Sequence, residues 1–285
     1  MCRLLAWAST EPVGARQILD AHEWDALRGL ARFHSDGWGM AASGGAEVRR
    51  STRAAIDDDA FDEAAGSITG ASALVHLRRA TPGYAVMAEN THPFVLDGWA
   101  FAHNGTIAHA ERLDGLVAAR WRERRRGTTD SERYFLAFLQ RLEERGDPAA
   151  ALRGTVAAIR DACGANGLNA VLCSAQHLLA VHAAGGQNPD RAALVALMGP
   201  DVADPANGVG PDHLADYFGL RYRTAAGRFV ISSTGIAGPG WKPLAEESLV
   251  LVDLARAVVE CRALGDGELL WTSALSPVER QSTGW

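Results

Sequence analysis

The sequence lacks the features that mark secreted, membrane-spanning and nucleic-acid-binding proteins. Its four cysteines, Cys2, Cys163, Cys173 and Cys261, are far apart and form no C-x-x-C pair, so we expect reduced thiols rather than a disulfide framework. No apolar run approaches the roughly 20 residues that span a bilayer, and the first ten residues carry one basic residue and no long apolar segment. These absences predict a cytoplasmic protein without a membrane partner.

Positive charge and cofactor motifs are also scarce. The formal net charge is −6, which argues against nucleic acid as a partner. The histidines and cysteines have no metal-ligand spacing, and neither a phosphate-binding loop nor a dinucleotide fingerprint is present. We therefore expect no metal and no cofactor.

The arrangement of apolar residues predicts helices between two strand-rich halves, and hence an α+β layered fold. Residues 167–285 could form a second domain or continue the same sheets. Strands are expected at 2–8, 71–80, 97–107, 168–174, 177–183, 191–197, 220–224, 227–233 and 248–254, with a hairpin around Gly44 and Gly45. Helices are expected at 13–32, 56–66, 109–120, 131–144 and 148–163.

Cys2 is the first candidate for chemistry. If Met1 is removed, its thiol lies beside a free α-amine, and the residue is nucleophile and base in one. Reference pKa values of about 8.5 for a thiol and about 7.7 to 8.0 for an α-amine allow the amine to relay the proton near neutral pH. The alternative is a small buried hydrophobic residue, the commoner use of a free cysteine.

Asn104 and Gly105 follow His103 at the end of an expected strand. An amide hydrolase needs hydrogen-bond donors for the oxygen of its tetrahedral intermediate, and an Asn amide with the next backbone N–H would supply two. The alternative is a type I′ hairpin turn, for which Asn-Gly is a favoured pair.

Two further motifs carry side chains suited to an amino-acid head group. In HLRRATPG, one arginine could grip a substrate carboxylate while Thr81 offers a hydroxyl, or both arginines could be solvated at a sheet edge. In TTDSE, Asp130 could bind an ammonium group or cap the following helix. An Arg and an Asp together meet the needs of an α-amino acid.

Three other segments stand out. SDGWG (35–39) and NTHPF (90–94) are unusual in composition, although turn chemistry also explains them. The arginine-rich stretch 120–126 is typical of a solvated loop, with substrate or partner contact as the less frequent use.

Taken in chain order, the motifs MCR, SDGWG, HLRRAT, NTHPF, AHNGTI and TDSE resemble the class II glutamine amidotransferases. The chain is most similar to stand-alone members related to the γ-glutamyl amidase of ergothioneine biosynthesis and to glutathione-degrading amidotransferase-like enzymes. The likeness is dense over residues 2–140 and fainter through LNAVLC, LRYR and SLVLVDL.

The resemblance implies a four-layer αββα N-terminal nucleophile hydrolase fold, in a single domain over 2–285, in which Cys2 forms a γ-glutamyl thioester. It also implies a role for each matching motif residue. These are oxyanion contacts at Asn104 and Gly105, carboxylate binding at Arg78, ammonium binding at Asp130, Thr81 in the arginine motif, and a supporting role for His92 near the pocket.

The chain departs from the family pattern in two places. Glucosamine-6-phosphate synthase-type members have Trp and His where this sequence has Arg79 and Pro82, and residues 231–241 replace an ASEP-like segment. The substrate is thus left open between glutamine and another γ-glutamyl amide.

Three functions follow, led by hydrolysis that releases glutamate plus an amine or ammonia. The second is a glutaminase subunit that delivers ammonia to a separate synthetase partner. The third is a catalytically silent binding protein with the same fold. The oligomeric state stays open.

Overall fold

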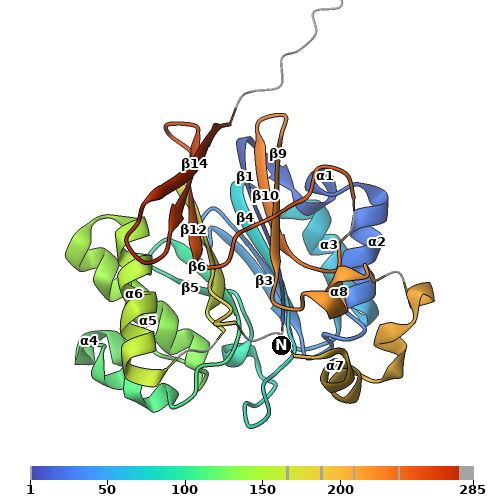
Figure 1. The fold of residues 1–285 in the computed structure, drawn as a ribbon, viewed down its shortest axis with the longest axis horizontal. Coiled ribbons are helices and arrows are strands. Elements are labelled where there is room, and N and C mark those ends of the chain that lie inside the picture. The colour runs from blue at the N-terminus through green and yellow to red at the C-terminus, as the bar shows by residue number, and fades with distance from the viewer. Residues whose placement is uncertain (1, 165–166, 187–188, 208, 237, 276–285) are drawn as a thin grey trace, which may run out of the picture.

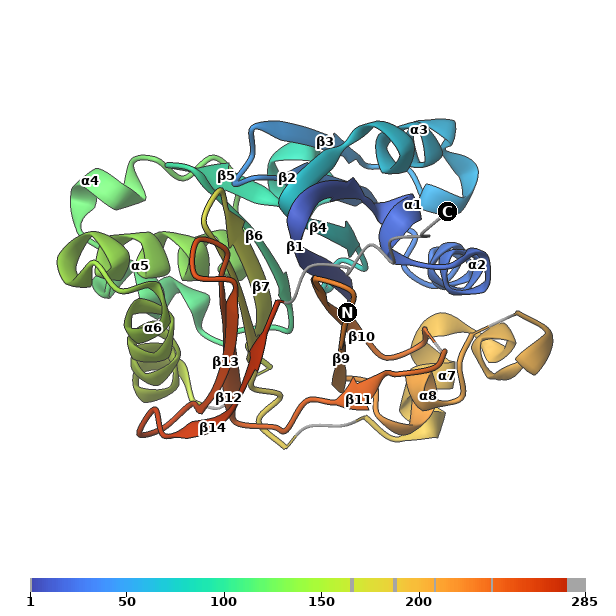
Figure 2. The same ribbon diagram turned by 90° about the horizontal axis from the view of Figure 1, so that it is seen from above.

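Two antiparallel sheets lie face to face in the computed structural model, which describes residues 2–164, 167–186, 189–207, 209–236 and 238–275. Each sheet has seven strands, and helices cover the outer face of each (Figures 1 and 2). The predicted α+β fold with αββα layers is confirmed. Residues 276–285, and Ala237 of the segment 231–241, lie outside the described residues.

The first sheet contains the N-terminal strand at its centre. Its order is β11-β9-β10-β1-β4-β2-β3, so β1 pairs with β10 on one side and β4 on the other. The strands are β1 (Arg3–Gly14), β2 (Trp38–Ala42), β3 (Glu47–Ser51), β4 (Thr69–Leu77), β9 (Leu220–Ala225), β10 (Arg228–Ser233) and β11 (Lys242–Pro243). Cys2 therefore lies at the start of a central, buried strand.

The second sheet has the order β14-β13-β12-β8-β7-β6-β5. Its strands are β5 (Phe94–Leu96), β6 (Trp99–Asn104), β7 (Asn169–Ser174), β8 (His177–His182), β12 (Ser248–Asp253), β13 (Val258–Ala263) and β14 (Leu269–Ala274). Asn104 ends β6 and pairs with Asn169 at the start of β7. The two sheets thus bring Cys2 and Asn104 from separate layers.

Helices form the outer layers. On the first sheet these are α1 (Ala15–Ile18), α2 (Ala21–Leu30), α3 (Asp59–Ser67) and α8 (Asp212–Ala215), with α7 (Arg191–Met198) near the end of the layer. On the second sheet they are α4 (Ala119–Arg122), α5 (Asp130–Arg145) and α6 (Pro148–Cys163). Short 3₁₀ turns are η1 (Ala55–Asp57), η2 (Ala88–Asn90), η3 (Ala110–Gly115), η4 (Pro200–Ala203) and η5 (Pro205–Asn207).

The core between the two sheets combines alanines with larger aliphatic side chains such as Leu4 and Leu178. Its members include Ala6, Ala8, Ala41, Ala100, Ala102 and Ala180. Larger aromatic residues fill the outer layers, for example Phe135 and Phe138 on α5 and Trp24 on α2. In the part of the chain that is described, no helix is long and apolar enough to cross a membrane.

Several sequence predictions hold closely and others need correction. The hairpin at Gly44 and the helices at 131–144 and 148–163 are confirmed within a residue. The helix expected over 13–32 starts only after β1 and is broken at Asp20, whose Oδ1 accepts from Glu23 N and starts α2. The helix expected over 109–120 is instead η3 followed by α4, with Ala118 N bonded to Gln140 Oε1 of α5.

The segment at 191–197 is the clearest error. It was expected as a strand, but it forms α7, capped by Asp190 Oδ1 accepting from Ala193 N at 2.7 Å. Ala and Leu are strong helix formers, and a run that is apolar throughout has no periodicity to separate helix from strand. Strands β11, β13 and β14 had no prediction at all.

Candidate active site

Cys2 is held at the centre of the first sheet by contacts to both its nitrogen and its sulfur. Cys2 N donates to Asn104 Oδ1 at 2.9 Å, and the backbone of Arg79 lies against the thiol, with Arg79 N donating to Sγ at 3.4 Å. The residue is 8% exposed. If Met1 is removed, the nitrogen bonded to Asn104 is the α-amine, fixed beside the thiol.

Arg3 was missed by sequence reasoning, yet it fixes the Cys2 backbone. Its Nε donates to Cys2 O at 2.7 Å and its Nη2 to Tyr217 O at 3.0 Å, and the guanidinium stacks on the Tyr217 ring. Burial lowers the pKa of Arg3. A charged residue in an otherwise apolar strand was the available signal, because a buried charge needs several partners.

Asn104 supplies both an acceptor and a donor at the end of β6. Its Oδ1 holds Cys2 N, while its Nδ2 is buried with no hydrogen-bond partner among the described residues. A buried amide N–H without a partner costs about 1 to 3 kcal/mol, so this donor has free capacity for a hydrogen bond.

Gly105 is packed too tightly to accept a side chain. A Cβ on it would lie 1.7 Å from Gly167 O. The hairpin alternative for Asn-Gly is wrong, because β6 pairs with β5 and β7 and the chain leads from Gly105 toward η3. Glycine is required here by close approach to another backbone.

The two adjacent arginines diverge after β4 ends at Leu77. Arg78 is 3% exposed and donates to Asp36 O at 3.3 Å and Ala85 O at 3.2 Å. Arg79 donates instead to Phe33 O and to Leu197 O. The alternative of two solvated arginines is therefore wrong for Arg78. Burial lowers the pKa of Arg78, while Cys2 and Asp36 act in the opposite direction.

The SDGWG segment braces the arginine segment. Arg78 N donates to Gly37 O at 2.8 Å, Asp36 N donates to Arg78 O at 3.0 Å, and Ala80 N donates to Asp36 Oδ2 at 2.8 Å. Farther along, the hydroxyls of Thr81 and Thr106 are 3.0 Å apart. These bonds tie the loop after β4 to the turn that contains Gly105.

Asp130 is buried at the first position of α5, facing the same turn. Thr129, and not Asp130, caps the helix, with Oγ1 accepting from Glu132 N at 3.2 Å. Asp130 Oδ2 accepts from Ile107 N at 2.7 Å and Oδ1 from Ser131 N at 2.8 Å. The cap alternative is thus wrong, and the carboxylate is held beside the turn after Asn104.

His103 lies between Ser131, which follows Asp130, and Gly167, which packs against Gly105, a relation that the HNG motif alone did not reveal. Its Nε2 lies 2.9 Å from Gly167 O and its Nδ1 2.9 Å from Ser131 Oγ. Because a carbonyl only accepts, Nε2 carries the proton in the neutral ring and Nδ1 is an acceptor. The single proton of Ser131 Oγ can then go either to His103 Nδ1 or to Asp130 Oδ1, which is 3.2 Å away. Burial lowers the pKa of His103, which favours this neutral form.

His92 lies behind these groups rather than among them. The centroid of its ring lies 4.3 Å from that of His76 and 4.6 Å from that of Phe94. The His92–Pro93 peptide is cis. Burial lowers its pKa well below the ordinary value. The residue therefore acts as a neutral ring in the interior, which suits a supporting position.

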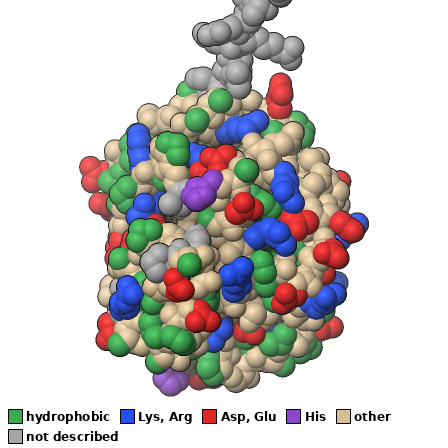
Figure 3. Space-filling view, turned by 90° about the vertical axis from the view of Figure 1, so that its right-hand side faces the viewer, with side chains coloured by type: hydrophobic (Ala, Val, Ile, Leu, Met, Phe, Trp, Pro, Cys, Tyr) green, Lys and Arg blue, Asp and Glu red, His purple; other side chains and the backbone are tan. Residues whose placement is uncertain are grey.

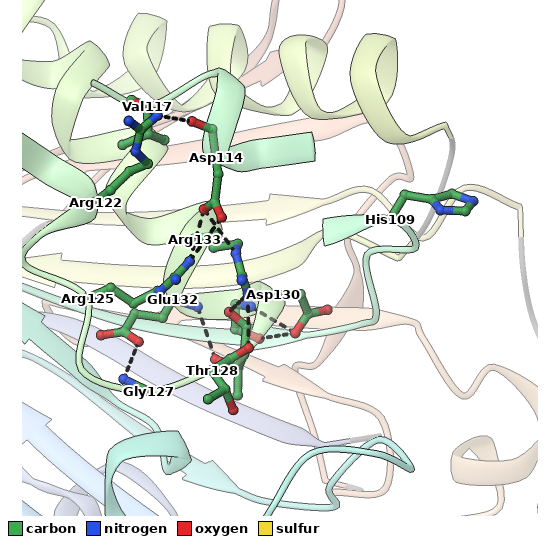
Figure 4. Close-up of polar contacts among 12 residues, drawn as sticks. His109, Asp114, Val117, Arg122, Arg125, Gly127, Thr128, Asp130, Glu132 and Arg133 are labelled. Carbon is green, nitrogen blue, oxygen red and sulfur yellow. Dashed lines mark hydrogen bonds and ion pairs between the residues drawn. The ribbon is translucent and has the colours of Figure 1, made fainter. Parts of the chain in front are cut away.

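The arginine-rich stretch is tied to protein groups near the start of α5 (Figure 4). Arg122 donates to Asp114 O and Val117 O, and Arg125 pairs with the Asp114 carboxylate at 2.9 Å. Arg133 of α5 binds the same carboxylate at 3.1 Å. Asp130 lies in the same view, and His109 points away from this cluster. Among the described residues, no group of three or more His, Cys, Asp or Glu side chains is placed to hold a metal ion.

Comparison with known proteins gives one family. The family described as "Glutamine amidotransferases class-II" matches residues 1–195, which is more than half of the chain and includes all of the residues discussed as site candidates. No curated protein is significantly similar to the chain in sequence.

Solved structures share the fold at low sequence identity. A glutamine aminotransferase class-II domain protein from Silicibacter pomeroyi is 20% identical, with TM-score 0.59, and the match covers 93% of this chain and 100% of that one. The allosteric regulatory enzyme of purine biosynthesis is 14% identical at TM-score 0.59, with 94% and 50% covered. Glutamine phosphoribosylpyrophosphate amidotransferase from B. subtilis is 15% identical at TM-score 0.55, with 96% and 49% covered. The chain thus spans about half the length of the last two.

Proposed function

The chain belongs to the class II glutamine amidotransferases, and from that membership we propose a cysteine-dependent amidohydrolase that cleaves glutamine or a γ-glutamyl amide. The reaction passes through a γ-glutamyl thioester on Cys2 and releases glutamate plus an amine or ammonia. One observation carries the proposal. Asn104 Oδ1 holds Cys2 N, while Asn104 Nδ2 is buried without a partner among the described residues.

Catalysis begins when the free α-amine of Cys2, exposed by loss of Met1, takes the thiol proton. The thiolate sulfur attacks the amide carbon, and the negative charge on oxygen is stabilised by Asn104 Nδ2 and Gly105 N. The protonated amine then gives its proton to the leaving nitrogen as the C–N bond breaks. Water, deprotonated by the same amine, hydrolyses the thioester to glutamate and restores the thiol.

The substrate head group fits the charges around the thiol. Arg78 is buried and its side-chain hydrogen bonds go to the backbone carbonyls of Asp36 and Ala85, so its charge can bind the α-carboxylate. Asp130 keeps acceptor capacity beside its two backbone donors and can bind the α-ammonium. Thr81 supports the loop between them, and His92 packs behind it. This pairing favours an α-amino acid over a simple amide.

A second candidate is a glutaminase that delivers ammonia to a separate synthetase. Two structural neighbours are about twice as long as this chain, which supports a function shared with a further module or partner. We also propose a cytoplasmic location, because the four cysteines are free, as is usual in a reducing compartment.

Glutamate release from purified protein tests the proposal. Intact mass first establishes that Met1 is absent. The expected result is turnover of glutamine or of a γ-glutamyl amide that Cys2→Ala abolishes, with a γ-glutamyl adduct trapped on wild-type protein by acid quenching. The Cys163→Ala variant is the matched control and should keep full activity. Absence of glutamate from every donor, alone or with added synthetases, would rule the proposal out. Turnover that rises only on adding a synthetase supports the second candidate.

A further inference from the structure

Helix α7 is apolar but leaves most of its surface in contact with water. Seven of the eight residues in RAALVALM are apolar, yet only Leu194 is buried, and Leu197 is 42% exposed. Ala193, Ala196 and Leu197 are exposed at the spacing of one helix face, which we call the α7 apolar face. A surface helix normally carries polar residues on its outer face, so this one needs an explanation.

One side chain connects this face to the candidate nucleophile. Arg79 N donates to Cys2 Sγ at 3.4 Å, and Arg79 Nη2 donates to Leu197 O at 2.6 Å. Arg79 therefore contacts the thiol with its backbone and the end of α7 with its guanidinium. Leu197 lies within the reach of one arginine from Cys2.

A second connection leads to the oxyanion turn. Leu194 and Met198, on the other side of α7, pack with Tyr217 and Phe218. Gly167 lies between Phe218 and Gly105, because a Cβ on Gly167 would be 3.4 Å from both Gly105 Cα and Phe218 Cε1. Helix α7 is thus anchored to both sides of the centre where Asn104 Nδ2 is buried without a partner among the described residues.

The side chains of the two arginines after β4 extend in different directions, and each marks the side on which one end of a bound substrate would lie. Arg78 points to Asp36 and Ala85, on the side proposed for the amino-acid head group, whereas Arg79 points to Phe33 and Leu197. In an amide attacked by Cys2, the head group and the leaving nitrogen lie on opposite sides of the carbonyl carbon. The leaving group is therefore directed toward the side on which Arg79 extends to Leu197, at the end of α7.

We propose that the α7 apolar face receives the amine portion of the substrate, and that the protein prefers γ-glutamyl amides of apolar amines to glutamine. The inference rests on the proposed function. Its occupant is set by the two connections to the Cys2 centre and by the apolar side chains of Ala193, Ala196 and Leu197, beside which the Arg79 guanidinium binds Leu197 O. Elsewhere on this side of the molecule, acidic and basic side chains are interspersed with hydrophobic ones (Figure 3).

A series of γ-glutamyl alkylamides tests the inference on the Met1-free protein. We expect kcat/KM to rise by about two- to fourfold per methylene from the ethylamide to the hexylamide, because each methylene is transferred from water to the apolar surface of the helix. The hexylamide should exceed glutamine by at least about tenfold. The readout is the ratio of kcat/KM for the hexylamide to that for glutamine, measured by glutamate release.

Leu197→Gln should lower this ratio at least fivefold, since Gln keeps the helix propensity and the length of the side chain but is polar. Leu270→Gln is the matched control, because Leu270 is 46% exposed on β14, and its ratio should equal that of the wild type. A flat alkyl series, or a Leu197→Gln ratio equal to the wild-type ratio, overturns the inference while glutamine turnover still supports the proposed function. No glutamate from any donor overturns both.

Discussion

The nitrogen of Cys2 and the side-chain oxygen of Asn104 are joined by a hydrogen bond of 2.9 Å, although 102 residues separate them in the chain. The bond crosses from the first sheet to the second, because Cys2 precedes β1 and Asn104 ends β6. It fixes the amide of Asn104 so that Oδ1 faces the Cys2 nitrogen and Nδ2 is left for another acceptor. In the proposed mechanism, one side chain therefore orients the base and binds the oxyanion.

The Asn104→Asp variant separates these two roles. Aspartate keeps an acceptor for Cys2 N but replaces the Nδ2 donor by a negatively charged oxygen. We expect kcat for glutamate release to fall by about 10² to 10³, the range for loss of one oxyanion donor, with a smaller change in KM. Steady-state kinetics on glutamine would check this.

The control for this variant is Asn169→Asp, at the position paired with Asn104 on β7. Asn169 is also buried, but its Nδ2 already donates to Phe218 O and its Oδ1 accepts from Ala183 N. The Asn169→Asp variant should show a marked loss of stability and only a small change in kcat. A kcat near the wild-type value in Asn104→Asp would contradict the oxyanion role.

We expect Asp130 to bind the ammonium group of the substrate and no other part of it. We expect Asp130→Asn to raise KM for glutamine by about 10- to 150-fold, because a hydrogen bond to a charged group contributes about 1.5 to 3 kcal/mol. Glutaramate, which lacks the α-amine, should be turned over equally by wild type and variant. The measurement is kcat/KM for both substrates with both proteins.

Asp114→Asn, in η3, is the matched control. Asp114 pairs with Arg125 and Arg133 and lies apart from the turn held by Asp130 (Figure 4). The ratio of glutamine to glutaramate turnover should not change in this variant. An Asp130→Asn protein that loses both substrates equally would show that Asp130 only braces the turn through Ile107 N.

The residues at strand ends were predictable from sequence, because short motifs carry them in a fixed order. Cys2, Arg78 and Asn104 lie just before β1, just after β4 and at the end of β6, where a strand pattern stops and a polar residue begins. The partners of these residues were not predictable. Arg3 and His103 act through backbone carbonyls of Tyr217 and Gly167, which are distant in sequence and carry no side-chain signal.

Helix α7 shows why composition alone misleads. RAALVALM was expected as a strand because apolar runs among strands usually continue a sheet, yet both strands of the β8–β12 pair already have their ladder partners. The Asp190 cap and the helix propensity of Ala and Leu decide the local structure. Its exposed surface is a property of tertiary packing and is not encoded in the local pattern.

Gly105→Ala should damage activity and stability together. The added Cβ would lie 1.7 Å from Gly167 O, which is backbone and cannot rotate away. We expect a loss of about 1 to 3 kcal/mol in the free energy of unfolding and a fall in kcat of at least about tenfold as the turn shifts. Urea unfolding and glutamine kinetics measure the two effects.

Gly115→Ala provides the comparison, since nothing lies within 4 Å of a Cβ at that position of η3. It should be neutral or stabilise by about 0.4 to 1 kcal/mol, because alanine restricts the unfolded chain. If Gly105→Ala behaves in the same way, the close packing of the oxyanion turn against Gly167 has no energetic role.

The buried histidines make stability fall in mild acid. Burial, with the charge of Arg78, lowers the pKa of His76 to about 3, and burial, with the charge of Arg3, lowers that of His213 to about 2. In the unfolded chain the value is about 6.5. Between these values the unfolded state binds more protons, so stability is full above pH 6.5 and decreases as pH falls. Each ring then costs roughly 2 to 3 kcal/mol at pH 4.5.

His76→Phe removes one such ring, together with its interaction with the His103 backbone. The decrease in unfolding free energy between pH 7 and pH 4.5, measured by urea titration, should be smaller than in wild type by roughly 2 to 3 kcal/mol. His22→Phe, on the exposed side of α2, should retain the wild-type decrease. Equal decreases in His76→Phe and wild type would mean that His76 is already protonated in the folded protein near pH 4.5, and that other groups set the acid limit.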